Sequence, residues 1–226
     1  MYIASTNSTN TLLKELIAKG EWPNGERFIR AGYQTAGRGQ TGNGWESEAD
    51  KNLLCSILLP PNKNLHFLNI AVSVAVRRII GEDFTIKWPN DIYWKDKKVA
   101  GILVENAIVG SEVKYSIAGI GLNVNQTEFK SDAPNPISLK QIYGTDFVVD
   151  ELMQKLYAEV QRTWEEDVWA EYKSHLYRRE GFWPFEDKNG KFEAAIQDVL
   201  PTGEIVLRDA NGQIRQYEFK QIKYIL

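Results

Sequence analysis

The sequence holds very little cysteine and histidine and no apolar run long enough to span a bilayer. Its 226 residues include one cysteine, Cys55, and two histidines. One thiol cannot form an intramolecular disulfide, and so few sulfur and imidazole groups do not support a zinc site. Cys55 lies in the apolar run Leu53–Leu59, where a free cysteine is typical of a protein core. We therefore predict that Cys55 has a packing role.

Targeting signals and strong charge are absent as well. Met1–Asn7 has neither the basic start nor the long apolar stretch of a secretion signal, and the apolar segment Leu68–Ile80 contains two arginines. We expect a cytoplasmic protein that does not bind membranes. The net charge of −3 gives no electrostatic reason to expect nucleic-acid binding. With 43% hydrophobic and 25% charged residues, the composition is that of an ordinary globular protein.

Periodic patterns predict a mixed α+β domain followed by a small β module. A first helix is expected between Ser8 as its N-cap and Gly20 as its stop. Further predicted elements are helices at Leu65–Ile80 and residues 150–177 and strands at Phe28–Thr35, Asn52–Leu59, Phe84–Trp88, Ile92–Trp94, Val99–Asn106 and Val113–Val124. Strands at Lys191–Val199, Glu204–Arg208 and Gln213–Phe219 are separated by tight turns, which suggests a barrel-like module.

The run Gly37–Gly42 matches the spacing of the dinucleotide-binding fingerprint G-x-G-x-x-G. That fingerprint must open a helix, and the residues that follow show no helical apolar face, so the dinucleotide interpretation fails. A plain surface loop is the alternative. Arg38 within the run offers a planar cationic fork for a phosphate or carboxylate, and Trp45 is an unusual residue for a linker. We therefore interpret the run as an anion-binding loop.

Three further segments combine polar residues with strand ends. Lys87–Asp91 brings a lysine, an amide and a carboxylate beside a proline, although an ordinary turn would have the same composition. Lys95–Lys98 is typical of a hairpin tip. Val99–Glu105 follows it and contains small residues, which are typical of a strand that lies close to a ligand or to another backbone. Gly119–Asn125 repeats that theme with two glycines and two amides.

Taken together, these segments resemble the ordered signature of biotin–protein ligases, also called biotin–[acetyl-CoA-carboxylase] ligases. The segments are Ser8–Asn10, Gln34–Gly42 with Trp45, Lys87–Asp91, Lys98–Glu105 and Gly119–Asn123, and their order runs through nearly the whole chain. The resemblance implies a class II synthetase-like catalytic domain, a mixed β-sheet flanked by helices, at residues 1–182. It also implies a small SH3-like β-barrel domain at residues 183–226.

The implied activity has two steps. The carboxylate of biotin attacks the α-phosphorus of ATP, which gives biotinyl-5′-adenylate and pyrophosphate. A lysine of a biotin carboxyl carrier domain then accepts the biotinyl group. The resemblance implies Mg²⁺ as cofactor, with biotin, ATP and the carrier domain as partners. The residue chemistry agrees, because two anions must meet and cations are needed where charge accumulates.

The resemblance also implies a role for each matching residue. Lys98 and Arg38 are the expected catalytic residues, with Lys98 contacting the biotin carboxylate and the α-phosphate. The expected biotin-binding residues are Ser8, Thr9, Asn10, Gln34, Gly37, Arg38, Lys98, Gly101 and Leu103. The expected ATP-binding residues are Arg38, Trp45, Lys87, Asn90, Asp91 and Asn123, with Trp45 stacking on adenine and Asp91 as the Mg²⁺ ligand.

Two positions depart from the family pattern. Gln40-Thr41 stands where many members carry a second basic residue, so the adenylate is expected to be retained less firmly. Ser5–Asn7 duplicates Ser8–Asn10, so either serine could face biotin, and the distance to Leu12-Leu13 favours Ser8. Some members carry an N-terminal winged helix that represses transcription. The first motif begins here by residue 8, so we expect no such domain and no DNA binding, and a monomer or weak homodimer.

Three other interpretations stay open on the sequence alone. A lipoate–protein ligase has related chemistry, but its Arg-Arg-x-x-Gly-Gly-Gly signature is absent. A non-catalytic biotin or nucleotide sensor would not need Lys98, Lys87 and Asp91 together. A structural α+β protein would match the ordered segments only by coincidence.

Overall fold

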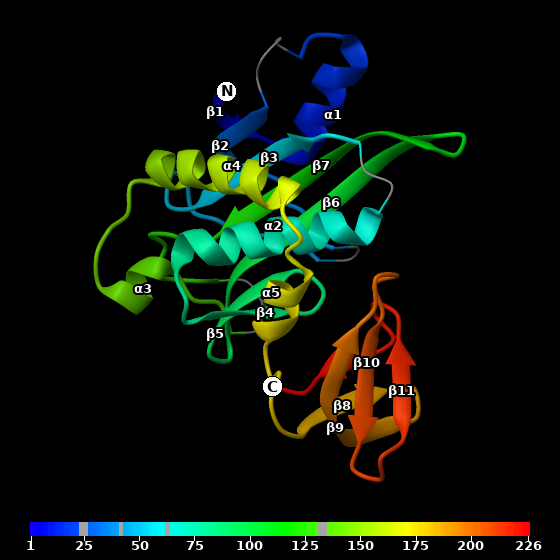
Figure 1. Cartoon of the computed structure of the whole chain (residues 1–226). Coiled ribbons are helices and arrows are strands. Elements are labelled where there is room, and N and C mark those ends of the chain that lie inside the picture. Colours follow the sequence, from blue (N-terminus) through cyan, green and yellow to red (C-terminus); the bar gives the residue numbers. More distant parts are fainter. Residues whose placement is uncertain (23–26, 41–42, 62–63, 131–134) are drawn as a thin grey trace.

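A seven-stranded mixed sheet forms the larger layer of the molecule (Figure 1). The computed structural model describes residues 1–22, 27–40, 43–61, 64–130 and 135–226. The strand order is β1-β2-β3-β7-β6-β5-β4, in which β1 and β2 are parallel and the later neighbours are antiparallel. The strands are β1 (Tyr2–Thr6), β2 (Phe28–Gln34), β3 (Leu53–Leu59), β4 (Phe84–Lys87), β5 (Asp91–Trp94), β6 (Lys97–Val109) and β7 (Glu112–Leu122).

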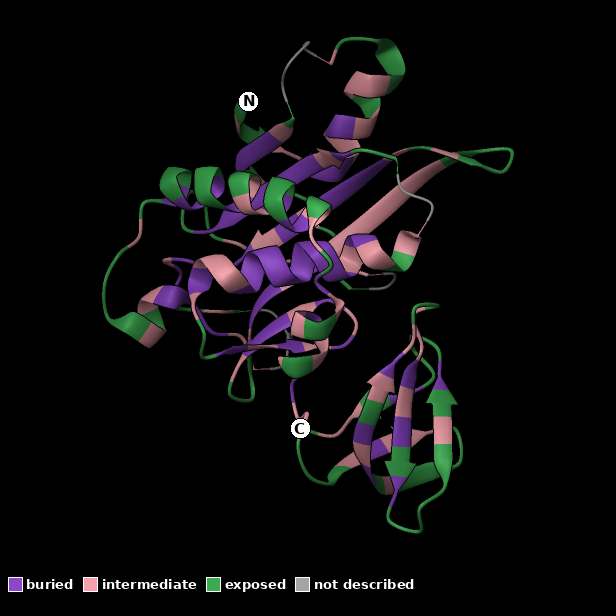
Figure 2. Ribbon diagram, in the orientation of Figure 1, coloured by how far each residue is buried: buried purple, intermediate pink, exposed green. Residues whose placement is uncertain are grey.

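Two long helices lie side by side across one face of this sheet (Figure 1). They are α2 (Leu65–Ile80) and α4 (Val149–Glu165), and α2 is buried over most of its length while α4 keeps an exposed face (Figure 2). Asn64 caps α2, because its side chain accepts hydrogen bonds from the backbone N–H groups of His66 and Phe67. The predicted bounds of this helix are confirmed.

The shorter helix α1 (Thr9–Lys19) packs on the opposite face of the sheet. Successive side chains of a strand point to opposite faces. On β3, Cys55 and Ile57 therefore join the core under α2, while Leu58 packs with Leu13 of α1. Gly20 ends α1 in the left-handed conformation with φ 71°, as the sequence predicts.

The predicted helix over residues 150–177 is wrong in its extent. The chain forms α4, leaves the helical conformation at Glu166 (ψ 152°), and starts again as α5 (Trp169–Ser174). Glu166 pairs there with Arg78 and Arg162, while Asp167 accepts a hydrogen bond from the backbone of Trp169. These local contacts interrupt a pattern that is otherwise helical. The sequence analysis also missed β1 and the short helix α3 (Leu139–Tyr143).

A second sheet of five antiparallel strands follows α5. Its order is β11-β10-β9-β8-β12, and its strands are β8 (Trp183–Asp187), β9 (Gly190–Val199), β10 (Ile205–Asp209), β11 (Ile214–Tyr217) and β12 (Lys223–Tyr224). The predicted strands β9 to β11 are confirmed within a few residues, whereas β8 and β12 were not predicted. Trp88 Nε1 donates to the carbonyl of Gly203 at 3.0 Å, which ties the second sheet to the turn between β4 and β5.

The described helices include no membrane-spanning candidate: each is too short or too polar to cross a bilayer.

Candidate active site

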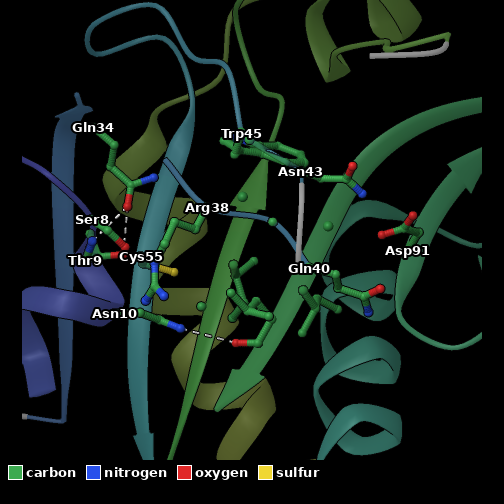
Figure 3. A pocket seen from close by; sticks show the side chains of 18 of the residues that line it. Ser8, Thr9, Asn10, Gln34, Arg38, Gln40, Asn43, Trp45, Cys55 and Asp91 are labelled. Carbon is green, nitrogen blue, oxygen red and sulfur yellow. Dashed lines mark hydrogen bonds between the residues drawn. The ribbon is translucent and has the colours of Figure 1, made fainter. Parts of the chain in front are cut away.

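A cavity lies where the N-terminus of α1, the loop after β2, and the central strands β6 and β7 meet (Figure 3). The structure brings ten of the sequence-predicted residues to its lining: Ser8, Thr9, Asn10, Gln34, Arg38, Trp45, Asp91, Lys98, Gly101 and Leu103. Ser8 and Leu103 are 95 positions apart along the chain, and the folding of the sheet brings these residues together. The cavity is therefore the candidate active site.

Hydroxyl and amide groups form one end of the cavity. The backbone N–H and the Oγ1 hydroxyl of Thr9 both donate to Gln34 Oε1, at 2.8 and 3.1 Å. Because the carbonyl oxygen of Gln34 is thus occupied, its NH₂ group is the end left to donate to a ligand. Ser8 is buried at the N-cap position of α1 but makes no side-chain capping bond, so its hydroxyl is available to the cavity. Ser5 lies exposed on β1.

Asn10 has both ends of its side-chain amide bonded within the protein. Its Oδ1 lies 2.5 Å from Ser56 Oγ, and its Nδ2 donates to Glu105 Oε2 at 2.7 Å. Gly119 leaves the space for this amide, since a Cβ atom there would lie 2.5 Å from Asn10 Oδ1. Asn10 therefore braces the cavity wall by these contacts.

Two ion pairs hold cations at the cavity. Lys98 Nζ lies 2.8 Å from Asp91 Oδ1, and Arg38 Nη2 lies 3.0 Å from Glu105 Oε2. All four side chains are partly exposed, so an incoming anion can reach both cations. The Lys98 ammonium also lies 5.7 Å from the centroid of the Trp45 ring, within cation–π range.

The Trp45 indole lies against glycines of the two central strands. A Cβ atom on Gly101 would lie 3.0 Å from Trp45 Cζ3, and one on Gly121 would overlap Cε2, Cδ2 and Cζ2 of the indole. Trp45 Nε1 is buried without a hydrogen-bond partner among the described residues. Glycine at these two strand positions is thus what admits the ring.

The loop after β2 folds back on itself and presents Arg38. Gly39 N donates to Asn43 O and Trp45 N donates to Gly37 O, each at 2.9 Å. A side chain at Gly37 would collide with the Trp45 carbonyl, which explains the glycine. Residues Thr41 and Gly42 of the predicted loop lie outside the described residues.

Three predicted ATP-side residues do not line the cavity. Lys87 donates to the Tyr93 hydroxyl at 3.2 Å, and burial lowers its pKa. Asn90 is buried; its amide donates to the carbonyl of Ile102 at 2.6 Å and its oxygen accepts from Gln40 at 2.9 Å. Asn123 is also buried and donates to a backbone carbonyl. Their roles toward ATP stay predictions.

Sequence reasoning missed two polar residues of the site. Ser56 is fully buried. Its hydroxyl stands inside the otherwise apolar run Leu53–Leu59, and this pattern could have indicated a buried polar contact. Glu105 ends the segment Lys98–Glu105, and the sequence alone assigns it no role. Cys55 belongs to the core as predicted but also lines the cavity, and burial raises the pKa of its thiol to about 12.

Glu105 receives three donors, two of them from residues that line the cavity. Its carboxylate accepts from Lys14, Asn10 and Arg38. Partial burial acts to raise the pKa of Glu105, but the hydrogen bonds from Lys14 and Asn10 and the charges of Lys14 and Arg38 outweigh it, and the pKa lies below its ordinary value of 4.5. The carboxylate is therefore ionised at neutral pH.

The family follows from the match to known proteins. The model of the biotin/lipoate A/B protein ligase family matches residues 2–123, and the chain belongs to this family. The matched segment carries β1 to β7 and the cavity.

Two relatives and one solved structure illustrate the similarity. The bifunctional ligase/repressor BirA of Bacillus subtilis is 35% identical over 127 residues, which are 53% of this chain and 38% of that protein. The biotin–[acetyl-CoA-carboxylase] ligase of Mycobacterium tuberculosis is 33% identical over 148 residues, 61% of this chain and 53% of that protein. The match thus spans about two fifths to one half of these relatives.

The structure of biotin protein ligase from Aquifex aeolicus in complex with biotin and ATP superposes with a TM-score of 0.81. The alignment covers 100% of this chain and 98% of that one at 24% sequence identity. This likeness shows the fold, including the second sheet.

Proposed function

We propose that the protein is an ATP-dependent biotin–protein ligase. It would convert biotin to biotinyl-5′-adenylate and transfer the biotinyl group to a lysine of a biotin carboxyl carrier domain. The observation that carries the proposal is one cavity lined by hydroxyl and amide groups at the start of α1, with two cations: Arg38 beside Asn10, and Lys98 beside Asp91. Biotin has a polar ureido ring at one end and a carboxylate at the other, so the cavity complements both ends.

The polar end supports binding of the ureido group. The NH₂ group of Gln34 and the Ser8 hydroxyl can donate to the ureido oxygen, while the Thr9 bonds keep Gln34 in that orientation. Gly101 and Leu103 of β6 supply a close wall for the ring and chain. A binding site of this kind needs only a few fixed polar groups in an otherwise close-fitting pocket.

The two cations of the cavity support the chemical step. Lys98 would leave Asp91 and contact both the biotin carboxylate and the α-phosphate, so that the two anions can approach. Arg38 would stabilise the charge that gathers as pyrophosphate leaves. Removal of one such preorganised contact commonly costs about 3 kcal/mol in the barrier.

The remaining ATP-side assignments follow the same proposal. Trp45 is the proposed adenine platform, and its cation–π contact with Lys98 keeps the two residues together. Lys87, Asn90 and Asn123 are proposed to serve the phosphates after local rearrangement. Gln40 bonds to Asn90 instead of supplying a second loop cation.

Asp91 is the candidate ligand that the cavity offers to a magnesium ion. Among the described residues there is no group of three or more carboxylate, imidazole or thiol ligands. Mg²⁺ commonly takes one or two carboxylates together with phosphate oxygens and water, so Asp91 alone meets the requirement. Asp91 would hold Mg²⁺, and the chemistry that the ion would supply there is neutralisation of phosphate charge.

We further infer that the five-stranded second sheet is an SH3-like barrel and forms a domain at residues 183–226, beside a class II synthetase-like domain at residues 1–182. The start of β8 at Trp183 supports this boundary. We propose a cytoplasmic location, because a biotin-dependent carboxylase and ATP would meet the enzyme there.

ATP–pyrophosphate exchange tests the proposed activity. Biotin should start the exchange and lipoate should not. Exchange with lipoate alone would instead identify a lipoate–protein ligase, and exchange with neither compound would favour a non-catalytic sensor.

A further inference from the structure

Glu105 does not line the cavity itself, but its carboxylate contacts two residues that do, Asn10 and Arg38. We propose that Glu105 is a positioning residue that fixes the guanidinium of Arg38 and the amide of Asn10; this inference rests on the proposed function. Three donors from two separate elements converge on its carboxylate. A surface carboxylate with a single flexible partner would not show this convergence.

The geometry assigns each carboxylate oxygen a task. Glu105 Oε1 pairs with Lys14 Nζ at 2.6 Å, while Oε2 accepts from Asn10 Nδ2 at 2.7 Å and from Arg38 Nη2 at 3.0 Å. The Glu105 side chain is 20% exposed, whereas Lys14 and Arg38 are about 40% exposed. The carboxylate is thus less exposed than the two cations that pair with it.

The Asn10 amide is aligned from its other end by Ser56. Ser56 is fully buried, and its hydroxyl lies 2.5 Å from Asn10 Oδ1, so the Asn10 oxygen faces β3 and its NH₂ faces Glu105. A rigid polar chain therefore runs from β3 through α1 to β6. Such a chain can hold a charged group in one place because each member is itself bonded.

Arg38 needs an anchor because it stands on a loop. Among the described residues, Glu105 is the one carboxylate that pairs with Arg38. The bond uses Nη2, and a guanidinium has five N–H donors, so further donors remain for an anionic ligand. Glu105 thereby holds the Arg38 guanidinium in place and leaves its other N–H groups free to bind an anion.

Glu105→Gln tests the inference, because glutamine keeps the size and an acceptor for Asn10 but removes the charge. We expect kcat/KM for biotin in ATP–pyrophosphate exchange to fall about tenfold, the usual scale for one charge-assisted hydrogen bond. In an Arg38→Gln background, adding Glu105→Gln should change the rate less than about twofold, since the two residues act as one unit. Glu112→Gln is the matched control: Glu112 pairs with Lys114 on the hairpin of the same sheet, 73% exposed and outside the cavity.

A second measurement does not depend on activity. The ¹⁵N relaxation of the Arg38 Nε–H group should give an order parameter near about 0.8 in the wild type and in Glu112→Gln, and below about 0.6 in Glu105→Gln. An equal order parameter for Arg38 in all three proteins would overturn the inference. So would an equal loss of exchange rate on Glu105→Gln in the wild-type and the Arg38→Gln backgrounds. A wild type that shows no biotin-dependent exchange would contradict the proposed function instead, and the relaxation result would still decide the positioning role.

Discussion

Gly121→Ala is a small substitution with a large expected effect on activity. Gly121 lies on β7 beneath the Trp45 indole, and the three heavy atoms nearest to a Cβ built there all belong to that indole. The strand itself can accept alanine, because no positive φ is required at Gly121. The added methyl group therefore acts first on Trp45.

The size of the displacement follows from the contacts. A Cβ at Gly121 would lie 2.7 Å from both Cδ2 and Cζ2 of Trp45, which is 0.7 Å short of the 3.4 Å at which ordinary van der Waals contact begins, and it would lie closer still to Cε2. The indole must move by at least that amount. A misplacement of about 1 Å near the reacting groups can lower the rate on the order of 100-fold. Alanine in a strand is about 0.5–1 kcal/mol more favourable than glycine, so the free energy of unfolding should not fall.

The assay combines ATP–pyrophosphate exchange with urea denaturation. We expect kcat/KM for ATP to fall on the order of 100-fold in Gly121→Ala while the urea midpoint stays within experimental error of the wild type or rises. In a Trp45→Ala background, Gly121→Ala should have no further effect on the exchange rate. An unchanged KM and kcat for ATP in Gly121→Ala, or a loss that persists without the indole, would refute the reasoning.

Four other changes have defined outcomes. Lys98→Ala should abolish adenylate formation and leave the unfolding midpoint unchanged, and normal exchange in this variant would remove Lys98 from catalysis. Asn64→Ala should lower the free energy of unfolding by about 1 kcal/mol through loss of the α2 cap, measured in urea. Trp88→Phe should lower it by about 1 kcal/mol, because the Gly203 carbonyl loses its donor. The pKa of Glu105 is lowered in the folded protein, so its ionised carboxylate stabilises the fold above pH 4.5, and this stabilisation is lost as the pH falls through the folded-state pKa. The difference in free energy of unfolding between the wild type and Glu105→Gln should therefore shrink in that acid range.

Most of the fold was accessible from the sequence because local signals were strong. The bounds of α2 follow from its apolar run and its flanking Asn64 and Gly81, and the turn residues of the second sheet fix β9 to β11. The break after Glu165 could not be predicted, because it depends on the pairing of Glu166 with Arg78, a residue 88 positions away. The parallel strand β1 was missed since its residues show no regular burial pattern.

The site was predicted as a set of residues but not as an arrangement. The motif resemblance named ten of the residues that line the cavity, yet only the strand order shows that Gly121 makes room for Trp45. The contacts of Glu105 and Ser56 likewise join α1, β3 and β6, which are distant in sequence. Long-range polar contacts leave no periodic signal in a single sequence.

Rapid-quench analysis of a single turnover with α-labelled ATP tests the central claim most directly. The account predicts that biotin, and not lipoate, produces biotinyl-5′-adenylate together with one equivalent of pyrophosphate, and that Lys98→Ala produces neither. Formation of an adenylate with lipoate alone, or full biotinyl-5′-adenylate formation by Lys98→Ala, would contradict it.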